Sequence, residues 1–113
     1  MQTTHDPTEA YLEALIAGAG TLLLSGFAGE PVVDDPLGGR VRGTADLQRF
    51  SSERQAWLVE RAARVEPLRT THNDQRTVFE SLLHLRLPEQ QVALPVAVVG
   101  EHAANRRVQA IRV

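Results

Sequence analysis

The order of hydrophobic and polar positions divides this chain into a helical first half and a strand-forming second half. Up to about residue 63, apolar residues recur at the three- and four-residue spacing typical of amphipathic helices. Beyond that point apolar and polar residues alternate, which is typical of half-buried strands. Three helices followed by strands joined through short turns predict an α+β domain.

The first helix has a clear start signal. Asp6 is a good N-cap, Pro7 suits the first helical position, and Glu9 occupies the capping-box position. We expect the helix to end near residues 18–20, where two glycines occur. Its apolar stripe consists of Tyr11, Leu12, Leu15 and Ile16.

Two further helices are predicted on either side of a short strand. Thr21 can cap a short helix that Gly29 stops, residues 31–35 form the strand, and residues 36–39 form a turn. Thr44 can then cap the third helix. The apolar face of this third helix is formed by Leu47, Phe50, Trp57 and Leu58.

The second half predicts an antiparallel meander. Strands are expected at about 64–71, 76–87, 92–99 and 107–113, with turns at 72–74, 88–90 and 103–105. In the 76–87 strand the two faces are distinct. One face carries Phe79, Ser81, Leu83, Leu85 and Leu87, and the other carries Val78, Glu80, Leu82, His84 and Arg86.

Composition narrows the classes of function. A chain of 113 residues supports one domain with one hydrophobic core. The formal net charge of −2 gives no electrostatic reason to expect a nucleic acid or an anionic membrane as partner. The absence of cysteine excludes thiol catalysis, and the absence of lysine among the 12 basic residues excludes Schiff-base chemistry.

Neither the histidines nor the N-terminus indicates a metal site or export. No two of the four histidines have metal-ligand spacing, so no metal site is predicted. The N-terminal residues lack the basic and apolar regions of a secretory signal, and no apolar run reaches membrane-spanning length. We therefore expect a cytoplasmic protein.

The segment with the most chemical information runs from Val33 to Gly43. Asp35 ends an apolar strand and is followed at once by Pro36 and a glycine pair, which places a carboxylate at the end of a strand. If Tyr11 faces the same cavity, the two provide a carboxylate base and a phenol donor, the groups needed to move a proton next to a carbonyl. The alternatives are that Asp35 only caps the turn and that Tyr11 is a core aromatic.

This order of elements, with a strand-Asp-Pro turn after two helices, resembles the NTF2-like superfamily over essentially the whole chain. The segment that matches best is residues 33–38, followed by Val41, Arg42, Gly43 and the helix to Phe50. The resemblance implies a cone-shaped α+β barrel in which three N-terminal helices pack on a curved antiparallel or mixed sheet. That superfamily includes ketosteroid isomerases, scytalone dehydratases and SnoaL-type polyketide cyclases.

The ketosteroid isomerase branch is the most similar, and it implies roles for individual residues. Asp35 corresponds to the proton-shuttling base, and Tyr11 corresponds to the donor to the developing oxyanion. The branch has an oxyanion aspartate on the penultimate strand, and the matching position here is Val98, which has no donor. The loss of one such donor typically costs about 10²–10³ in rate.

The alternation also predicts which side chains line a pocket. A flat apolar ligand would suit such a lining, although the same side chains could instead fill a closed core. The predicted lining consists of Phe27, Val33, Phe50, Trp57, Phe79, Leu83, Leu94, Val96, Val98 and Ile111.

The opposite face of the 76–87 strand, with Glu80, Leu82, His84 and Arg86, is interpreted as a homodimer surface, as the resemblance implies. A catalytic role for His84 is the alternative, but His84 points away from the side that Leu83 and Leu85 share. Arg40 and Arg42 are either an exposed solvated pair or ligands for an anion.

Two hypotheses of function follow. The first is a ketosteroid-isomerase-like or SnoaL-like enzyme that transfers a proton on a steroid, a polyketide or a similar apolar carbonyl compound. The second is a non-catalytic ligand-binding or dimerisation module that keeps the pocket without the chemistry. Neither needs a metal or an organic cofactor. Because the last strand stops abruptly at Val113, we also expect either that the natural protein continues or that the domain is truncated in its last strand.

Overall fold

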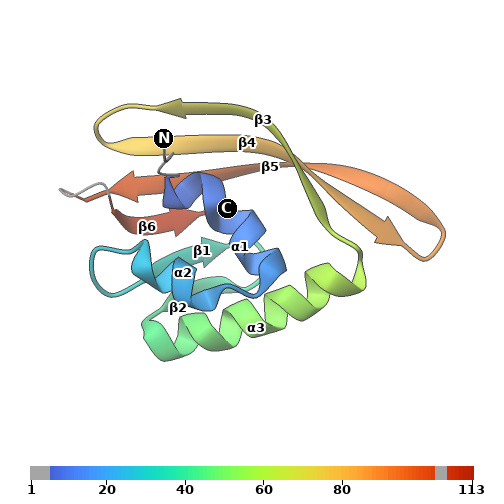
Figure 1. Ribbon diagram of the computed structural model, residues 1–113, viewed down its shortest axis with the longest axis horizontal. Helices are drawn as coiled ribbons and strands as arrows, with labels where there is room; N and C mark the ends of the chain where they lie inside the picture. The colour runs from blue at the N-terminus through green and yellow to red at the C-terminus, as the bar shows by residue number, and fades with distance from the viewer. Residues whose placement is uncertain (1–5, 104–106) are drawn as a thin grey trace, which may run out of the picture.

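The computed structural model describes residues 6–103 and 107–113, which form three helices and six strands (Figure 1). In chain order the elements are α1 (Pro7–Ala17), α2 (Gly20–Ser25), β1 (Val32–Asp35), β2 (Gly39–Arg42), α3 (Thr44–Glu60), β3 (Arg64–His72), β4 (Arg76–Leu87), β5 (Gln90–His102) and β6 (Val108–Arg112).

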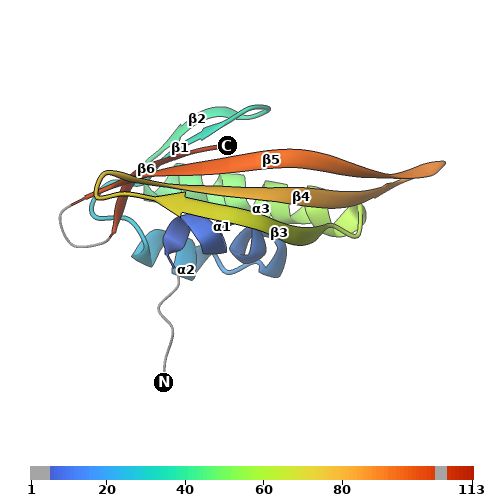
Figure 2. The ribbon, with the colours of Figure 1, turned by 90° about the horizontal axis from the view of Figure 1, so that it is seen from above.

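The six strands form one mixed sheet in the order β2-β1-β6-β5-β4-β3. All neighbours are antiparallel except β1 and β6, which are parallel. Helix α1 packs against the long strands β3, β4 and β5, whereas α3 packs against α1, α2 and β2. Figure 2 shows α1 and α2 on one side of the long strands. The predicted α+β class is confirmed, but within the described residues the sheet does not close into a barrel, because β2 and β3 remain edges.

Helix α1 begins and ends where the sequence predicts. Asp6 is its N-cap, and one carboxylate oxygen accepts a hydrogen bond from the Thr8 N–H at 2.7 Å. Gly18 ends the helix in the left-handed conformation with φ of 71°, which glycine adopts at little cost.

The two predicted threonine caps are wrong. Helix α2 begins at Gly20 with Ala19 at the N-cap, and α3 begins at Thr44 with Gly43 at the N-cap. Neither cap has a side-chain hydrogen bond. Each helix starts one or two residues earlier than expected, so both threonine hydroxyls lie within the first turn and not before it.

Strand β4 covers the predicted residues and separates its two faces as the alternation indicates. Phe79, Ser81, Leu83 and Leu85 are buried, whereas Glu80 and Arg86 are exposed. Strand β5 is longer than predicted because its pairing with β4 continues along the whole of β4. Part of the predicted turn at 103–105, namely residues 104 and 105, lies outside the described residues.

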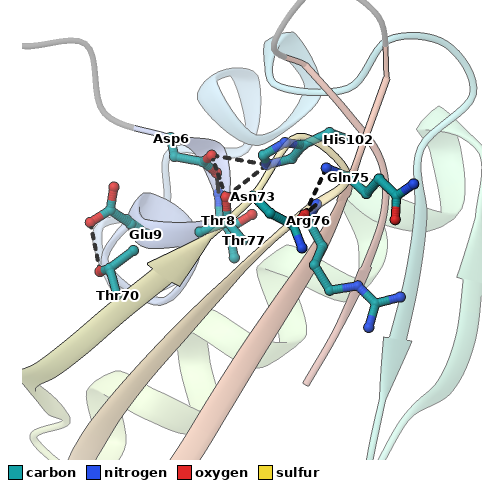
Figure 3. A network of polar contacts seen from close by, with 9 residues as sticks. All are labelled: Asp6, Thr8, Glu9, Thr70, Asn73, Gln75, Arg76, Thr77 and His102. Atoms are coloured by element: carbon teal, nitrogen blue, oxygen red, sulfur yellow. Dashed lines mark hydrogen bonds and ion pairs between the residues drawn. The ribbon is translucent and has the colours of Figure 1, made fainter.

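A polar network fastens the start of α1 to the ends of β4 and β5 (Figure 3). The Thr77 hydroxyl donates to Asp6 Oδ2 at 2.8 Å and lies 2.7 Å from His102 Nε2. Since a hydroxyl has one hydrogen, His102 Nε2 donates to Thr77. Next to this network, a Cβ atom at Gly100 would collide with the Thr8 hydroxyl, so α1 and β5 approach as closely as glycine permits.

The core fills the space between α1 and the sheet. Tyr11, Leu15, Val33, Val98 and Ile111 are all nearly inaccessible to solvent there. The far end of the β4–β5 hairpin extends past the helices in both views (Figures 1 and 2). In the part of the chain that the structure describes, no helix has the length and apolar character needed to cross a membrane.

Candidate active site

Asp35 lies at the end of β1 with its side chain only 9% exposed. Its Oδ2 atom accepts hydrogen bonds from the N–H groups of Leu37 and Gly38, at 3.0 and 2.7 Å. These contacts close the turn between β1 and β2. The preceding residue, Asp34, points the other way and forms an exposed ion pair with Arg40 at 2.8 Å. Of the two adjacent carboxylates, Asp35 is therefore the one directed inward.

Arg54 of α3 supplies the third hydrogen bond to Asp35. Its Nη2 atom donates to the same Oδ2 at 2.8 Å, and the arginine side chain is 17% exposed. The guanidinium carbon lies 5.4 Å from the Phe50 ring centre and 5.6 Å from that of Trp57. Two aromatic rings and a carboxylate thus fix the orientation of one cationic group.

Tyr11 is 1% exposed in the core, and its hydroxyl has no hydrogen-bond partner among the described residues. Burial raises the pKa of the Tyr11 phenol, the Asp35 charge raises it further, and the Arg54 charge opposes this rise. The phenol is therefore neutral at physiological pH and keeps its hydrogen to donate. Its titration responds to both Asp35 and Arg54, so the three groups belong to one electrostatic environment.

A cavity of about 440 Å³ lies between the β1–β2 hairpin and α3. It is large enough for a small organic ligand. Neither Asp35 nor Tyr11 is on its wall, but Gly38 is, and a Cβ atom at Gly38 would lie 3.4 Å from Asp35 Oδ2. The carboxylate thus lies directly behind the wall. The lining residues are Gly38, Arg40, Val41, Asp46, Arg49, Phe50, Glu53, Arg54 and Trp57.

Two of the ten side chains predicted to line a pocket, Phe50 and Trp57, border this cavity. Leu94 is 43% exposed and does not line the cavity, and Val96 is half-buried and packs against the core. The other six are packed in the core: Phe27, Val33, Phe79, Leu83, Val98 and Ile111.

Sequence reasoning missed Arg54, the side chain that hydrogen bonds to Asp35. It also missed the polar wall residues Asp46, Arg49 and Glu53. Arg54 follows Phe50 by four positions and precedes Trp57 by three, so the helical period places it on their face. That periodicity is the signal that could have found it.

The other polar candidates lie in ion pairs on the surface. Arg42 lies 3.7 Å from Glu30, with both side chains 58% exposed. His84 Nε2 lies 2.7 Å from Glu66 Oε1 on the face of the sheet opposite the helices. Within residues 6–103 and 107–113, no group of three or more histidine and acidic side chains is arranged to hold a metal ion.

Comparison with known proteins finds similarity in structure and not in sequence. No family model matches the chain, and no curated protein matches it significantly. Solved structures do match over nearly the whole chain. A putative polyketide cyclase from Sinorhizobium meliloti has a TM-score of 0.70 at 19% identity, covering 96% of this chain and 94% of that one.

Two further structures superpose equally well. A hypothetical protein with a ketosteroid isomerase-like fold from Catenulispora acidiphila, in complex with trimethylamine, has a TM-score of 0.72 at 14% identity, covering 97% and 85% of the two chains. An NTF2-like protein of unknown function from Cytophaga hutchinsonii also reaches 0.72 at 14% identity, covering 96% of each. The chain therefore has the NTF2-like fold, and at these identities the likeness extends to the fold alone.

Proposed function

We propose that this protein transfers a proton on a small, apolar carbonyl compound, as a ketosteroid-isomerase-like or SnoaL-like enzyme. The observation that supports this most directly is the arrangement of Asp35. Three donors engage its Oδ2 atom, while no described residue hydrogen bonds to Oδ1. An oriented carboxylate with one free oxygen has the properties of a general base.

Tyr11 supplies the second half of this proposal. Its neutral, unpartnered hydroxyl can donate to the oxygen on which negative charge develops after the proton leaves. Phe50 and Trp57 provide the apolar surface against which a flat ligand would pack. Gly38 and Arg54 both border the cavity and donate to Asp35, so a ligand beside them is the one placed nearest to the carboxylate.

The test is exchange of acidic protons on a panel of enolisable ketones, including a Δ5-3-ketosteroid, followed by nuclear magnetic resonance and by dienone absorbance. We expect Asp35→Asn to reduce the rate by about 10²–10⁴, because a positioned general base typically contributes that factor. Asp34→Asn is the matched control, since it removes an adjacent but outward-facing carboxylate. Equal rates for the wild type and Asp35→Asn would exclude the proposed base.

Ligand binding without turnover is the second candidate. Two observations favour it: Val98 is buried and offers no donor, and the Asp35 carboxylate is not on the cavity wall. Trp57 is the only tryptophan and borders the cavity, so its fluorescence reports occupancy directly. A ketone that shifts this fluorescence while its protons remain unexchanged would support the binding module.

We further propose that two copies associate through the sheet face opposite the helices. On β4 this face carries Glu80, Leu82, His84 and Arg86. On β5 it carries Ala93, Pro95 and Ala97, which are exposed and pair with His84, Leu82 and Glu80. A strip of small apolar side chains beside Leu82 is a flat surface suited to a second sheet.

A further inference from the structure

The ion pair between Asp35 and Arg54 uses one oxygen and one nitrogen. Arg54 Nη2 contacts Asp35 Oδ2, and among the described residues no hydrogen bond is made by Asp35 Oδ1 or Arg54 Nη1. A bidentate arginine–carboxylate pair would occupy both oxygens and two nitrogens. The pair therefore leaves Asp35 Oδ1 free as an acceptor and Arg54 Nη1 free as a donor, on two side chains that are hydrogen-bonded to each other.

Arg54 borders the cavity, so a ligand there lies beside its side chain. Its Nε atom is inaccessible to solvent and has no hydrogen-bond partner among the described residues, while the side chain as a whole is 17% exposed. Phe50 and Trp57, which stack near the guanidinium, border the same cavity. A ligand packed on these rings would lie beside the guanidinium edge.

The charge balance of the cavity wall favours a neutral ligand. Each arginine on the wall already has an acidic partner: Arg40 pairs with Asp34, Arg49 with Asp46, and Arg54 with Asp35. With these charges compensated, the wall has no excess positive charge to attract an anion. A neutral carbonyl oxygen, which needs only a donor, fits this environment.

We propose that Arg54 is a catalytic residue of the reaction proposed above, and that it binds the carbonyl oxygen of a neutral, enolisable ligand through Nη1. Asp35 Oδ1 then removes the proton from the carbon next to the carbonyl. The carbon–hydrogen bond breaks, its electron pair forms the carbon–carbon double bond of the enolate, and negative charge moves onto the oxygen at Arg54. Return of the proton from Oδ1–H to carbon restores the carboxylate.

This assignment rests on the proposed function, and it supplies the donor that Val98 cannot provide. A guanidinium stabilises the enolate oxygen more than a neutral donor does, because its hydrogen bond is charge-assisted. Phe50, Trp57 and Asp35 already hold the guanidinium in a fixed orientation. Arg54 would thus both orient the base and stabilise the enolate.

The kinetic test compares Arg54→Met and Arg54→Lys with Arg76→Met, which removes an arginine that pairs with Glu101 and does not line the cavity. We expect Arg54→Met to lower kcat by about 10²–10³ with a smaller change in KM, as the loss of an oxyanion donor does. Arg54→Lys keeps a positive charge beside Asp35 and therefore preserves the fold. One ammonium group cannot donate to Asp35 and to the ligand in the two fixed directions of a guanidinium, so we expect kcat to fall at least about tenfold. Arg76→Met changes kcat by no more than about twofold, because Arg76 is half-exposed in an ion pair away from the cavity wall.

A spectroscopic test does not require turnover. The probe is 2-naphthol, a planar phenol whose absorbance distinguishes the neutral and ionised forms, bound to Asp35→Asn. This variant has the charge that the site carries once Asp35 has taken a proton. We expect the bound probe to be partly ionised in Asp35→Asn and neutral in the Asp35→Asn, Arg54→Met double variant.

The outcomes separate the two proposals. If exchange depends on Asp35, but neither kcat nor the ionisation of 2-naphthol depends on Arg54, the role of Arg54 is overturned and the proposed function is retained. No exchange on any ketone, together with ionisation that depends on Arg54, would overturn the proposed function and support oxygen binding by Arg54. Failure of 2-naphthol to bind Asp35→Asn would overturn the Arg54 assignment.

Discussion

Tyr11 is buried, and its hydroxyl has no hydrogen-bond partner among the described residues. The two properties rarely occur together. A buried hydroxyl without a partner loses the hydrogen bonds it would make to water, which costs about 1–3 kcal/mol. A phenylalanine would fill the same space without that cost. Keeping a tyrosine here therefore favours a role for the hydroxyl in contact with a ligand.

We expect Tyr11→Phe to separate stability from activity. The free energy of unfolding, measured by urea denaturation, should stay unchanged or rise by roughly 1 kcal/mol because an unpaired polar atom is removed. Proton exchange on the ketone panel should fall by about tenfold or more as one donor to the enolate oxygen is lost. A destabilisation above about 2 kcal/mol would instead show that the hydroxyl has a structural partner.

At the scale of elements, the polar network at the start of α1 connects a helix cap to the sheet. Asp6 Oδ1 caps the Thr8 N–H, and Asp6 Oδ2 accepts from Thr77 and lies 3.2 Å from His102 Nε2. Burial alone would raise the pKa of the Asp6 carboxyl. The hydrogen bonds from Thr8 and Thr77 and the charge of His102 outweigh burial, and the pKa is lowered overall.

The lowered pKa of Asp6 predicts a pH-dependent contribution to stability. A carboxyl whose pKa is lower in the folded than in the unfolded state stabilises the fold above its unfolded value of about 4, and this contribution is lost as the pH falls further. Asp6→Asn keeps a good N-cap but removes the charge. We expect the wild type to be more stable than Asp6→Asn at neutral pH and the difference to shrink below about pH 4.

Thermal unfolding followed by circular dichroism across this pH range measures that difference. Asp74→Asn, at an exposed turn aspartate, is the control and should show no comparable change. A difference between wild type and Asp6→Asn that stays constant with pH would show that the charge of Asp6 does not contribute.

For the whole molecule, the sequence predicts what depends on local periodicity and misses what depends on packing between distant segments. The bounds of β4 and the start of α1 are predicted correctly because alternation and capping residues determine them locally. Strand β2 was not predicted, since Gly39–Arg42 has a single apolar side chain, Val41, and forms a strand by pairing with β1.

The candidate site shows the same division. Asp35 is recognisable from its turn and from the resemblance, whereas Arg54 has the appearance of one more charge on a helix surface. Only the approach of α3 to the β1–β2 hairpin brings the guanidinium to Asp35 and forms the cavity beside it. The position of that cavity could not be predicted, because the predicted lining followed the sheet and the cavity lies against α3.

The sheet face opposite the helices gives the prediction that belongs to the whole molecule. Stable interfaces bury about 800 Å² on each partner, and the neighbouring strands β3, β4 and β5 are the three longest strands of the sheet. We expect sedimentation equilibrium to give twice the 12.4 kDa mass of one chain. Ala97→Arg should return the mass to that of one chain, because it places a charge within the exposed apolar strip on β5. Ala45→Arg, at an exposed position of α3, adds the same charge to the helical side and should leave the dimer intact. A wild-type mass of one chain, or a dimer unaffected by Ala97→Arg, would exclude this face as the interface.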